Sequence, residues 1–194
     1  MRRRNHVLPR VRVAVMRIRE TRWLLAGAGL ALIAILLSAC GATALPADIE
    51  ISLYQGGDVL GSNTVTLSDL LDDGKPMVLN MWAGLCSACR LEMPHLENVY
   101  QEYANEVLIL GLDIGPFVGL GDREDALALL DELDVTYPAG ATDNIDVVKA
   151  YQVVGTPSLF FITPDGEIVK RWAGMMAEDD LKESIEELLA ASGN

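Results

Sequence analysis

Two cysteines separated by two residues carry the clearest chemical signal in this sequence. Cys86 and Cys89 follow an apolar run at 77–81 and open a stretch with helical spacing that reaches about Tyr103. At the start of a helix, unpaired backbone N–H groups and the helix dipole favour an anion, so the first sulfur is expected to ionise readily. The second sulfur lies one turn further in, where it can attack a mixed disulfide. The pair therefore predicts thiol–disulfide exchange with Cys86 as the attacking thiolate.

Two other uses of this spacing compete with exchange. A structural zinc site needs four ligands, and the remaining cysteine and histidine residues of the chain are Cys40, His6 and His95. Two of these lie near the N-terminus and no second closely spaced pair exists, so we expect no metal and no cofactor. A purely structural disulfide is the other alternative, although it would close a very small loop.

The elements around the cysteine pair follow the pattern of an α/β domain. Short apolar runs bounded by turn residues indicate strands, and apolar residues three and four apart indicate helices. The order is strand, helix, strand, helix, then a hairpin turning at 163–166 and a closing helix, which predicts an α/β sandwich with a mixed central sheet flanked by helices, in one domain at 49–194. The expected strands are 49–53, 65–67, 77–81, 107–113, 158–162 and 168–172, and the expected helices begin near 86, 122, 145 and 178.

Two blocks of the sequence resemble a known family. The residues at 80–94, NMWAGLCSACRLEMP, resemble the active-site region of thioredoxin-like proteins, and within them the TlpA/ResA-type membrane-anchored thiol–disulfide oxidoreductases. The residues at 154–162, VGTPSLFFI, are similar to the second hallmark of these proteins, a loop whose cis-proline faces the cysteines. The resemblance extends over about 49–189. It implies a thioredoxin-like fold and reduction of disulfides in partner proteins, often in cytochrome c maturation, where the cysteines of apocytochrome c are kept reduced for haem attachment.

Thr156 and Pro157 are expected to form a cis peptide bond beside the sulfurs and to bind the substrate backbone. An X–Pro bond keeps only about 0.5–1 kcal/mol of trans preference, and the chain has to turn sharply here before the buried strand at 158–162. Proline also lacks an N–H group, so no donor from it approaches the thiolate. The alternative is a trans proline that merely opens the strand.

Other positions within the first block distinguish subfamilies. Asn80 stands where cytoplasmic thioredoxins carry a buried Asp, whereas Glu92 matches a Glu that TlpA/ResA-type proteins place three residues after the second cysteine. The resemblance implies that Glu92 assists proton transfer; the alternative is a solvated surface acid. Trp82 is expected at the substrate-binding surface, with a core position as the alternative. Leu85 departs from the Trp that is usual before the first cysteine, and His95 is expected on the helix surface.

The first forty residues have the layout of an export signal or membrane anchor. Residues 1–39 carry eight Arg and one Glu, and the run WLLAGAGLALIAILL at 23–37 is apolar throughout. At about 1.5 Å per residue this run spans roughly 22 Å, less than a bilayer core of about 30 Å. The sequence Leu-Ser-Ala-Cys that ends at Cys40 resembles the lipobox of bacterial lipoproteins. Cys40 is therefore expected to carry lipid after cleavage of the signal peptide at 1–39, with 40–48 as a tether.

Two alternatives remain for this leader. The apolar stretch could stay as an uncleaved membrane anchor, or cleavage after Ala44 could release a soluble protein. All three readings place the body of the chain outside the cytoplasmic membrane, anchored at its extracytoplasmic face in the first two. Because the basic segment is long for a signal, Met16 is an alternative to Met1 as the start.

The body of the chain is strongly acidic. The net charge is -13, and residues 40–194 hold seven Lys and Arg against twenty-seven Asp and Glu. This balance excludes nucleic acid as a ligand, because phosphate binding needs clustered basic residues. We expect a monomer that acts on protein thiols and disulfides, apocytochrome c among them, and is supplied by a membrane electron donor. The alternatives are an oxidant that inserts disulfides, a copper chaperone, and a redox-inert binding domain.

Overall fold

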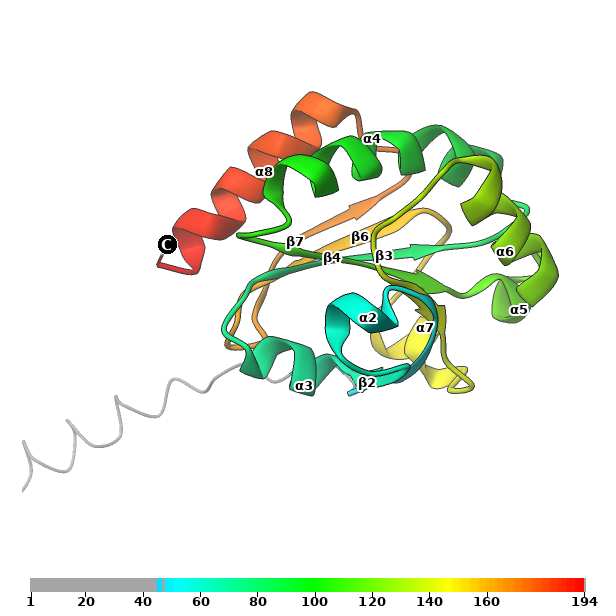
Figure 1. Cartoon of the computed structure of the whole chain (residues 1–194), viewed down its shortest axis with the longest axis horizontal. Helices are drawn as coiled ribbons and strands as arrows, with labels where there is room; N and C mark the ends of the chain where they lie inside the picture. The colour runs from blue at the N-terminus through cyan, green and yellow to red at the C-terminus, as the bar shows by residue number, and fades with distance from the viewer. Residues whose placement is uncertain (1–44, 47, 194) are drawn as a thin grey trace, which may run out of the picture. The chain divides into compact units, whose positions relative to one another are not determined.

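The fold is built on one seven-stranded mixed sheet (Figure 1). In spatial order its strands are β2 (Thr64–Thr66), β1 (Glu50–Gln55), β5 (Ala139–Ala141), β4 (Leu108–Asp113), β3 (Met77–Trp82), β6 (Ser158–Ile162) and β7 (Ile168–Ala173). β4 pairs in parallel with β3 and with β5, and all other neighbouring strands are antiparallel. The predicted sandwich with a mixed central sheet is therefore confirmed.

The computed structural model describes residues 45, 46 and 48–193. The predictions for the signal peptide at 1–39, for lipid on Cys40 and for cleavage after Ala44 lie outside these residues. Within the described part, no helix combines the length and the apolar character needed to cross a membrane.

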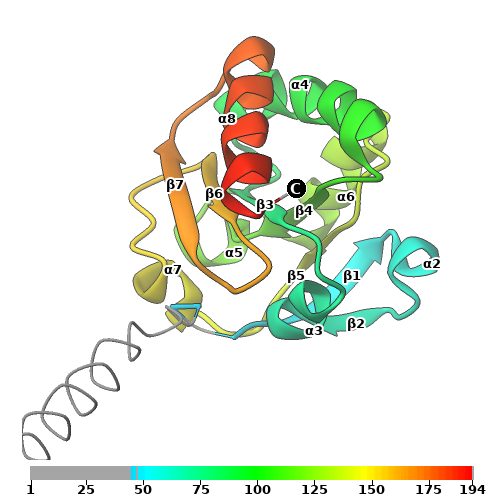
Figure 2. The ribbon, with the colours of Figure 1, turned by 90° about the vertical axis from the view of Figure 1, so that its left-hand side faces the viewer.

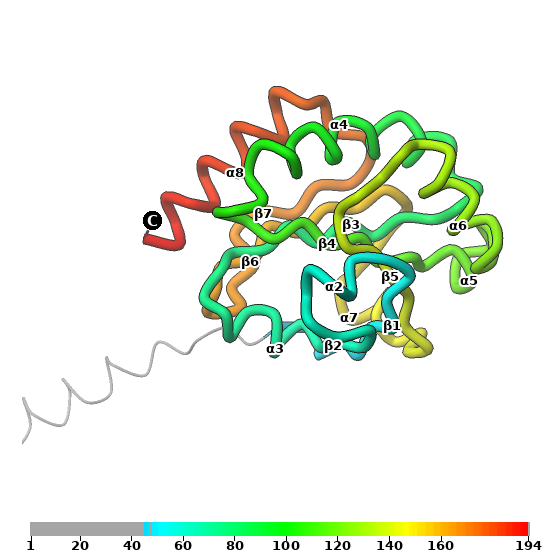
Figure 3. The backbone as a smooth tube through the Cα atoms, in the orientation of Figure 1, coloured from blue at the N-terminus to red at the C-terminus, as the bar shows by residue number. Residues whose placement is uncertain are grey.

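Helices cover both faces of the sheet (Figures 1 and 2). They are α2 (Gly57–Leu60), α3 (Leu67–Asp72), α4 (Ser87–Tyr103), α5 (Gly115–Val118), α6 (Arg123–Glu132), α7 (Asp146–Ala150) and α8 (Glu178–Ala191). α4 and α8 pack side by side on one face, as the backbone trace in Figure 3 also shows, with α6 on the same side. α3 and α7 cover the opposite face with a second apolar core. The other apolar core lies between the sheet and α4, α6 and α8, directly beneath the cysteine-bearing helix.

β3 is the strand that leads into the cysteines. All six of its residues are buried, because it lies inside the sheet and is covered on both faces. Val78 and Trp82 belong to the core under α4, whereas Leu79 and Met81 belong to the core on the other side. Side chains alternate along a strand, so Asn80 faces the same side as α4 and brings a polar amide into that core.

Each of the six expected strands is present to within two residues, but β5, α2, α3 and α5 were not predicted. The three residues of β5, Ala-Gly-Ala, lack the β-branched and aromatic side chains that are typical of strands. They form a strand because they lie between β1 and β4, where Gly140 allows the backbone of Ser52 to approach closely. α3 begins where the side chain of Thr66 accepts a hydrogen bond of 3.1 Å from the N–H of Asp69. The end of β2 is thus also a helix cap.

Candidate active site

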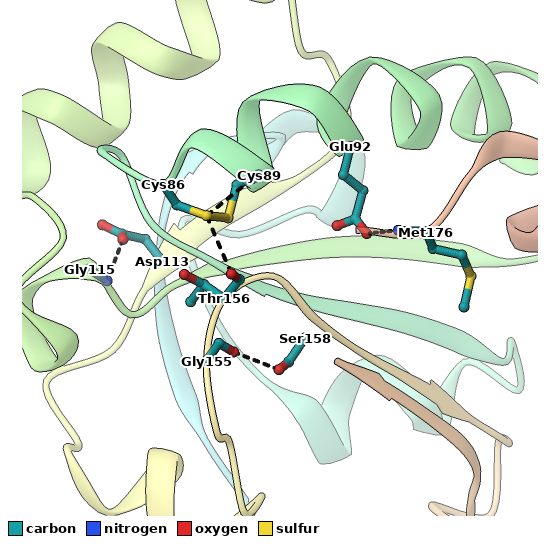
Figure 4. Close-up of a disulfide and its surroundings, with 9 residues drawn as sticks. All are labelled: Cys86, Cys89, Glu92, Asp113, Gly115, Gly155, Thr156, Ser158 and Met176. Atoms are coloured by element: carbon teal, nitrogen blue, oxygen red, sulfur yellow. Dashed lines mark hydrogen bonds between the residues drawn. A yellow bond between two sulfur atoms is a disulfide. The ribbon is translucent and has the colours of Figure 1, made fainter. Parts of the chain in front are cut away.

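Cys86 and Cys89 form a disulfide at the start of α4 (Figure 4). Cys86 is the N-cap residue of this helix, and its Sγ accepts a hydrogen bond of 3.1 Å from the backbone N–H of Cys89. Cys86 keeps 6% of its surface exposed, whereas Cys89 has none. The same N–H group and the helix dipole would stabilise a thiolate on Cys86 in the reduced protein. The geometry therefore gives the two sulfurs different roles, with Cys86 the one that a substrate can reach.

The turn before Cys86 is held by the loop between α5 and α6 and by α6 itself. The N–H of Leu85 donates to the carbonyl of Leu120 at 2.9 Å, in the segment between α5 and α6. A side chain at Gly84 would come within 2.6 Å of the backbone of Asp125 and Ala126, so only glycine allows α6 to pack this closely. These contacts fix the point at which the chain leaves β3 and enters α4.

The loop before β6 lies against the disulfide. The Thr156–Pro157 peptide bond is cis, and the carbonyl oxygen of Thr156 lies 3.5 Å from Sγ of Cys86 (Figure 4). The N–H of Gly174, just after β7, donates to the carbonyl of Pro157 at 2.8 Å, and the hydroxyl of Ser158 donates to that of Gly155 at 2.7 Å. In the reduced state the Cys86 thiol could donate a hydrogen bond to the carbonyl oxygen of Thr156. The backbone of this loop is therefore positioned to contact whatever binds at Cys86.

Glu92 lies on the buried side of α4, one turn beyond Cys89. It has no exposed surface, and its Oε1 accepts a hydrogen bond of 2.9 Å from the N–H of Met176 (Figure 4). Burial raises the pKa of Glu92 to about 7, although the Met176 bond favours the carboxylate and acts in the opposite direction. The alternative of a solvated surface acid is therefore wrong, and the group is poised to bind and release a proton near neutral pH.

A second buried carboxyl group was not predicted from the sequence. Asp113, at the end of β4, is almost fully buried, and its two oxygens accept hydrogen bonds from the N–H of Gly115 at 2.8 Å and from the hydroxyl of Tyr54 at 3.0 Å. Burial raises the pKa of Asp113, while both hydrogen bonds favour its ionised form. The guanidinium of Arg123 lies 4.5 Å from the centre of the Tyr54 ring. An acidic residue directly after the apolar run of β4 is the only sequence signal for this group.

The AhpC/TSA family matches this chain over residues 48–171, more than half of its length. The chain belongs to this family. Two curated relatives are the thiol-disulfide oxidoreductases ResA of Oceanobacillus iheyensis, 32% identical over 136 residues, and of Halalkalibacterium halodurans, 30% identical over 130 residues. The matches cover 69% and 66% of this chain and 66% and 69% of those proteins, so the chain spans about two thirds of their length.

A solved structure extends the comparison to the fold. The exposed lipoprotein thioredoxin of Streptococcus pneumoniae strain TIGR4 matches with a TM-score of 0.61 and 25% identity, over 73% of this chain and 99% of that one. The thioredoxin-like fold and the resemblance to ResA-type thiol–disulfide oxidoreductases are thus confirmed. The Cys86–Cys89 disulfide supports that activity in this AhpC/TSA member.

Trp82 and His95 are both less exposed than predicted. Trp82 has no exposed surface and lies in the core under α4. A fully buried side chain cannot contact a substrate, so its placement at the substrate-binding surface is wrong and its core alternative holds. His95 is only partly exposed, and its Nδ1 lies 3.5 Å from the carbonyl oxygen of Met176, the residue that also binds Glu92.

The raised pKa of Glu92 predicts that stability falls as pH rises. The folded protein holds this proton up to about pH 7, whereas the unfolded chain releases it near pH 4.5. Between these values the folded state binds more protons, so the free energy of unfolding should fall by about 3 kcal/mol and then level off. Urea unfolding of the oxidised protein at a series of pH values should show this fall in wild type but not in Glu92→Gln.

The matched control is Glu183→Gln, which removes an exposed acid from α8. It should keep the same fall in stability between pH 4.5 and pH 7. Equal pH dependence in wild type and Glu92→Gln would contradict the assignment of a buried, protonated carboxyl group.

Proposed function

We propose that this protein reduces disulfide bonds in other proteins at the extracytoplasmic face of the cell membrane. The observation that carries the proposal is the pairing of one accessible sulfur, Cys86, with one enclosed sulfur, Cys89, at a helix N-terminus beside the Thr156–Pro157 loop. This arrangement suits a nucleophile that meets the substrate and a second thiol that meets only the intermediate.

The reaction then runs in two exchange steps. The Cys86 thiolate attacks one sulfur of a substrate disulfide; a bond forms to Cys86, the substrate disulfide breaks, and the released thiolate takes a proton from water. Cys89 next gives its proton to the Glu92 carboxylate and attacks Sγ of Cys86, which releases the second substrate sulfur as a thiolate. This second thiolate also takes a proton from water, and Glu92 returns the Cys89 proton to solvent. The substrate thus gains two electrons and two protons, and the protein is left with the Cys86–Cys89 disulfide. A membrane electron donor would return the two electrons.

Exposed apolar side chains around the disulfide support a protein as the substrate. We call Leu85, Val154, Trp172 and Met175 the apolar rim; each is at least 43% exposed. Leu85 precedes Cys86, Val154 lies two residues before Thr156, and the other two flank Gly174, which is bonded to Pro157. Exposed apolar groups gathered at one place are typical of protein-binding surfaces. An unfolded chain such as apocytochrome c presents the apolar residues that would cover them.

The location outside the membrane rests on the leader and on the structural comparison. The basic and apolar segments at 1–39 precede Cys40 in the pattern of a lipoprotein, and the pneumococcal neighbour is named an exposed lipoprotein. Thiol exchange also suits an oxidising compartment, where substrate disulfides form. The acidic body disfavours adhesion to anionic lipid, so anchoring would depend on the leader or its lipid.

Insertion of disulfides is the second candidate, because the same pair can run in either direction. The reduction potential separates the two. A value near that of thioredoxin, about -270 mV, would support the reductase, whereas a value near about -120 mV would support an oxidant.

Cys89→Ser should trap substrates covalently. Without the second thiol, the mixed disulfide on Cys86 cannot be released by internal attack. Incubation with a disulfide-containing unfolded protein should give an adduct that intact-mass analysis detects and dithiothreitol removes. The matched variant Cys86→Ser should give no adduct. Adducts that form on Cys89 and not on Cys86 would reverse the assignment of the two sulfurs.

Glu92→Gln should slow the second exchange step and change its pH dependence. The amide keeps the shape of the side chain but cannot accept the Cys89 proton, and general bases typically contribute about 10²–10⁴-fold. Stopped-flow measurement of mixed-disulfide decay should show a wild-type rate that rises through pH 7. The rate of the variant should be lower and should not show this rise. Superimposable pH–rate profiles would remove Glu92 from proton transfer.

Trp172→Ala should weaken binding of protein substrates without affecting small disulfides. An exposed aromatic side chain at an interface is often worth about 1 kcal/mol or more, or roughly a fivefold rise in KM. The control is Val59→Ala, an apolar residue on α2 that is even more exposed than Trp172. The apolar rim has no role in recognition if Trp172→Ala leaves the KM for an unfolded protein disulfide unchanged.

Lipid on Cys40 predicts the mass of the mature protein. Signal cleavage before Cys40 and acylation would give a chain that begins at this residue and carries the additional mass of its lipid. Intact-mass analysis of the membrane fraction measures this directly. A mature chain that starts at Leu45, or one that keeps Met1 or Met16, would contradict lipidation.

A further inference from the structure

A cluster of buried polar atoms lies beneath the active-site helix. Six side-chain atoms in the described part of the chain are buried without a hydrogen-bond partner, and five of them come from only four residues. All four residues have fully buried side chains. The five atoms are Nδ2 and Oδ1 of Asn80, Nε1 of Trp82, Oε2 of Glu92 and the hydroxyl oxygen of Tyr137. We call these four residues the polar cluster.

Gly111 in β4 brings three members of the polar cluster together. Asn80 is its parallel partner in β3, so the side chain of Asn80 and the missing side chain of Gly111 face the same side of the sheet. A Cβ atom at Gly111 would lie 2.9 Å from Nε1 of Trp82 and 3.2 Å from Cε2 of Tyr137. The indole and the phenol ring therefore share the space that a larger residue in β4 would fill.

Glu92 closes the cluster from the side of α4. Burial raises the pKa of the Tyr137 hydroxyl most strongly, the Glu92 carboxyl raises it further, and the Asn80 amide lowers it. Tyr137 also packs against α4 itself: its ring meets that of Tyr100 edge-on at 6.2 Å, and its N–H donates to Glu97 at 3.4 Å. Oε1 of Glu92 is bound to Met176, which leaves Oε2 as the oxygen that is available to the cluster.

Buried polar groups in proteins are almost always hydrogen-bonded, to each other or to enclosed water. We propose that Tyr137 is a positioning residue for Glu92: its hydroxyl, held by the Asn80 amide, donates through buried water to Oε2 and stabilises the carboxylate. This inference rests on the proposed function, in which that carboxylate accepts the Cys89 proton. Tyr137 would then tune the pH at which the second exchange step runs, without touching the sulfurs or the substrate.

Few other titratable groups face Glu92 from the elements packed around it. On α4 itself these are the cysteines, His95 at the carbonyl of Met176, and Glu97, which accepts from the backbone before β5. The others are held by partners of their own; they are Asp113 at the end of β4, bound to Tyr54 and Gly115, and Glu178 and Lys182 on α8, paired with each other.

The direct test is the pKa of Glu92 in the oxidised protein, measured from the ¹³C shift of its carboxyl carbon during a pH titration. Tyr137→Phe removes only the hydroxyl and should raise this pKa above its value of about 7 by about one unit. The control is Tyr100→Phe, because that ring packs edge-on against Tyr137 at 6.2 Å and is itself only partly buried. It should leave the pKa of Glu92 unchanged. An unchanged pKa in Tyr137→Phe would overturn the proposal.

A measurement on the wild-type chain covers the case in which Tyr137→Phe does not fold. The ¹³Cζ shift of Tyr137 should change with a midpoint near pH 7, because the hydroxyl senses the ionisation of Glu92, and this change should vanish in Glu92→Gln. A Tyr137 signal that does not respond in this pH range would contradict the proposed water-mediated contact between Tyr137 and Glu92.

The experiments distinguish failure of the positioning role of Tyr137 from failure of the proposed function. A shifted pKa in Tyr137→Phe together with an unchanged exchange rate in Glu92→Gln would support the network and remove Glu92 from catalysis. A slowed exchange in Glu92→Gln with an unshifted pKa in Tyr137→Phe would keep the function and overturn the positioning role. If the positioning role of Tyr137 and the proton-transfer role of Glu92 are both correct, the midpoint of the pH–rate profile in Tyr137→Phe should move upward with the pKa of Glu92.

Discussion

The hydrogen bond from the Cys89 N–H to Sγ of Cys86 is the interaction on which the site depends. It makes one sulfur atom both the cap of α4 and the reactive group, so the start of the helix and the nucleophile are the same point in space. The end of β3 and the start of α4 must then meet within a few residues. Three features hold the chain at this junction: the buried central strand, the close approach of α6 at Gly84, and the hydrogen bond from Leu85 to Leu120.

Burial distinguishes the two sulfurs from each other and from the proposed proton acceptor, Glu92. Cys86 opens to the surface beside the Thr156 carbonyl, whereas Cys89 and Glu92 are enclosed. Enclosure penalises charge on the carboxyl group and brings its pKa to about 7. The same enclosure leaves Cys89 with no exposed surface. An accessible sulfur and a shielded carboxyl group thus follow from the packing of one helix on one sheet.

The parts of this fold that depend on local pattern could be predicted from the sequence. The buried strand before Cys86, the helix after it, and the two family motifs were sufficient for the sandwich and for the catalytic pair. What could not be predicted depends on long-range packing. β5 is a strand only because β1 and β4 lie on either side of it, and the burial of Trp82 and Tyr137 depends on the absence of a side chain at Gly111. Asp113 and Tyr54 are 59 residues apart and meet only in the folded sheet.

The most direct measurement is the reduction potential of the Cys86–Cys89 pair between pH 5 and pH 9, in wild type and in Glu92→Gln. If Glu92 takes up the proton of the second thiol, its ionisation must differ between the oxidised and reduced proteins, since a nearby thiolate raises its pKa. The wild-type potential should then fall more steeply with pH around neutrality than that of the variant. Parallel curves over the whole range would contradict the coupling between Glu92 and the sulfurs.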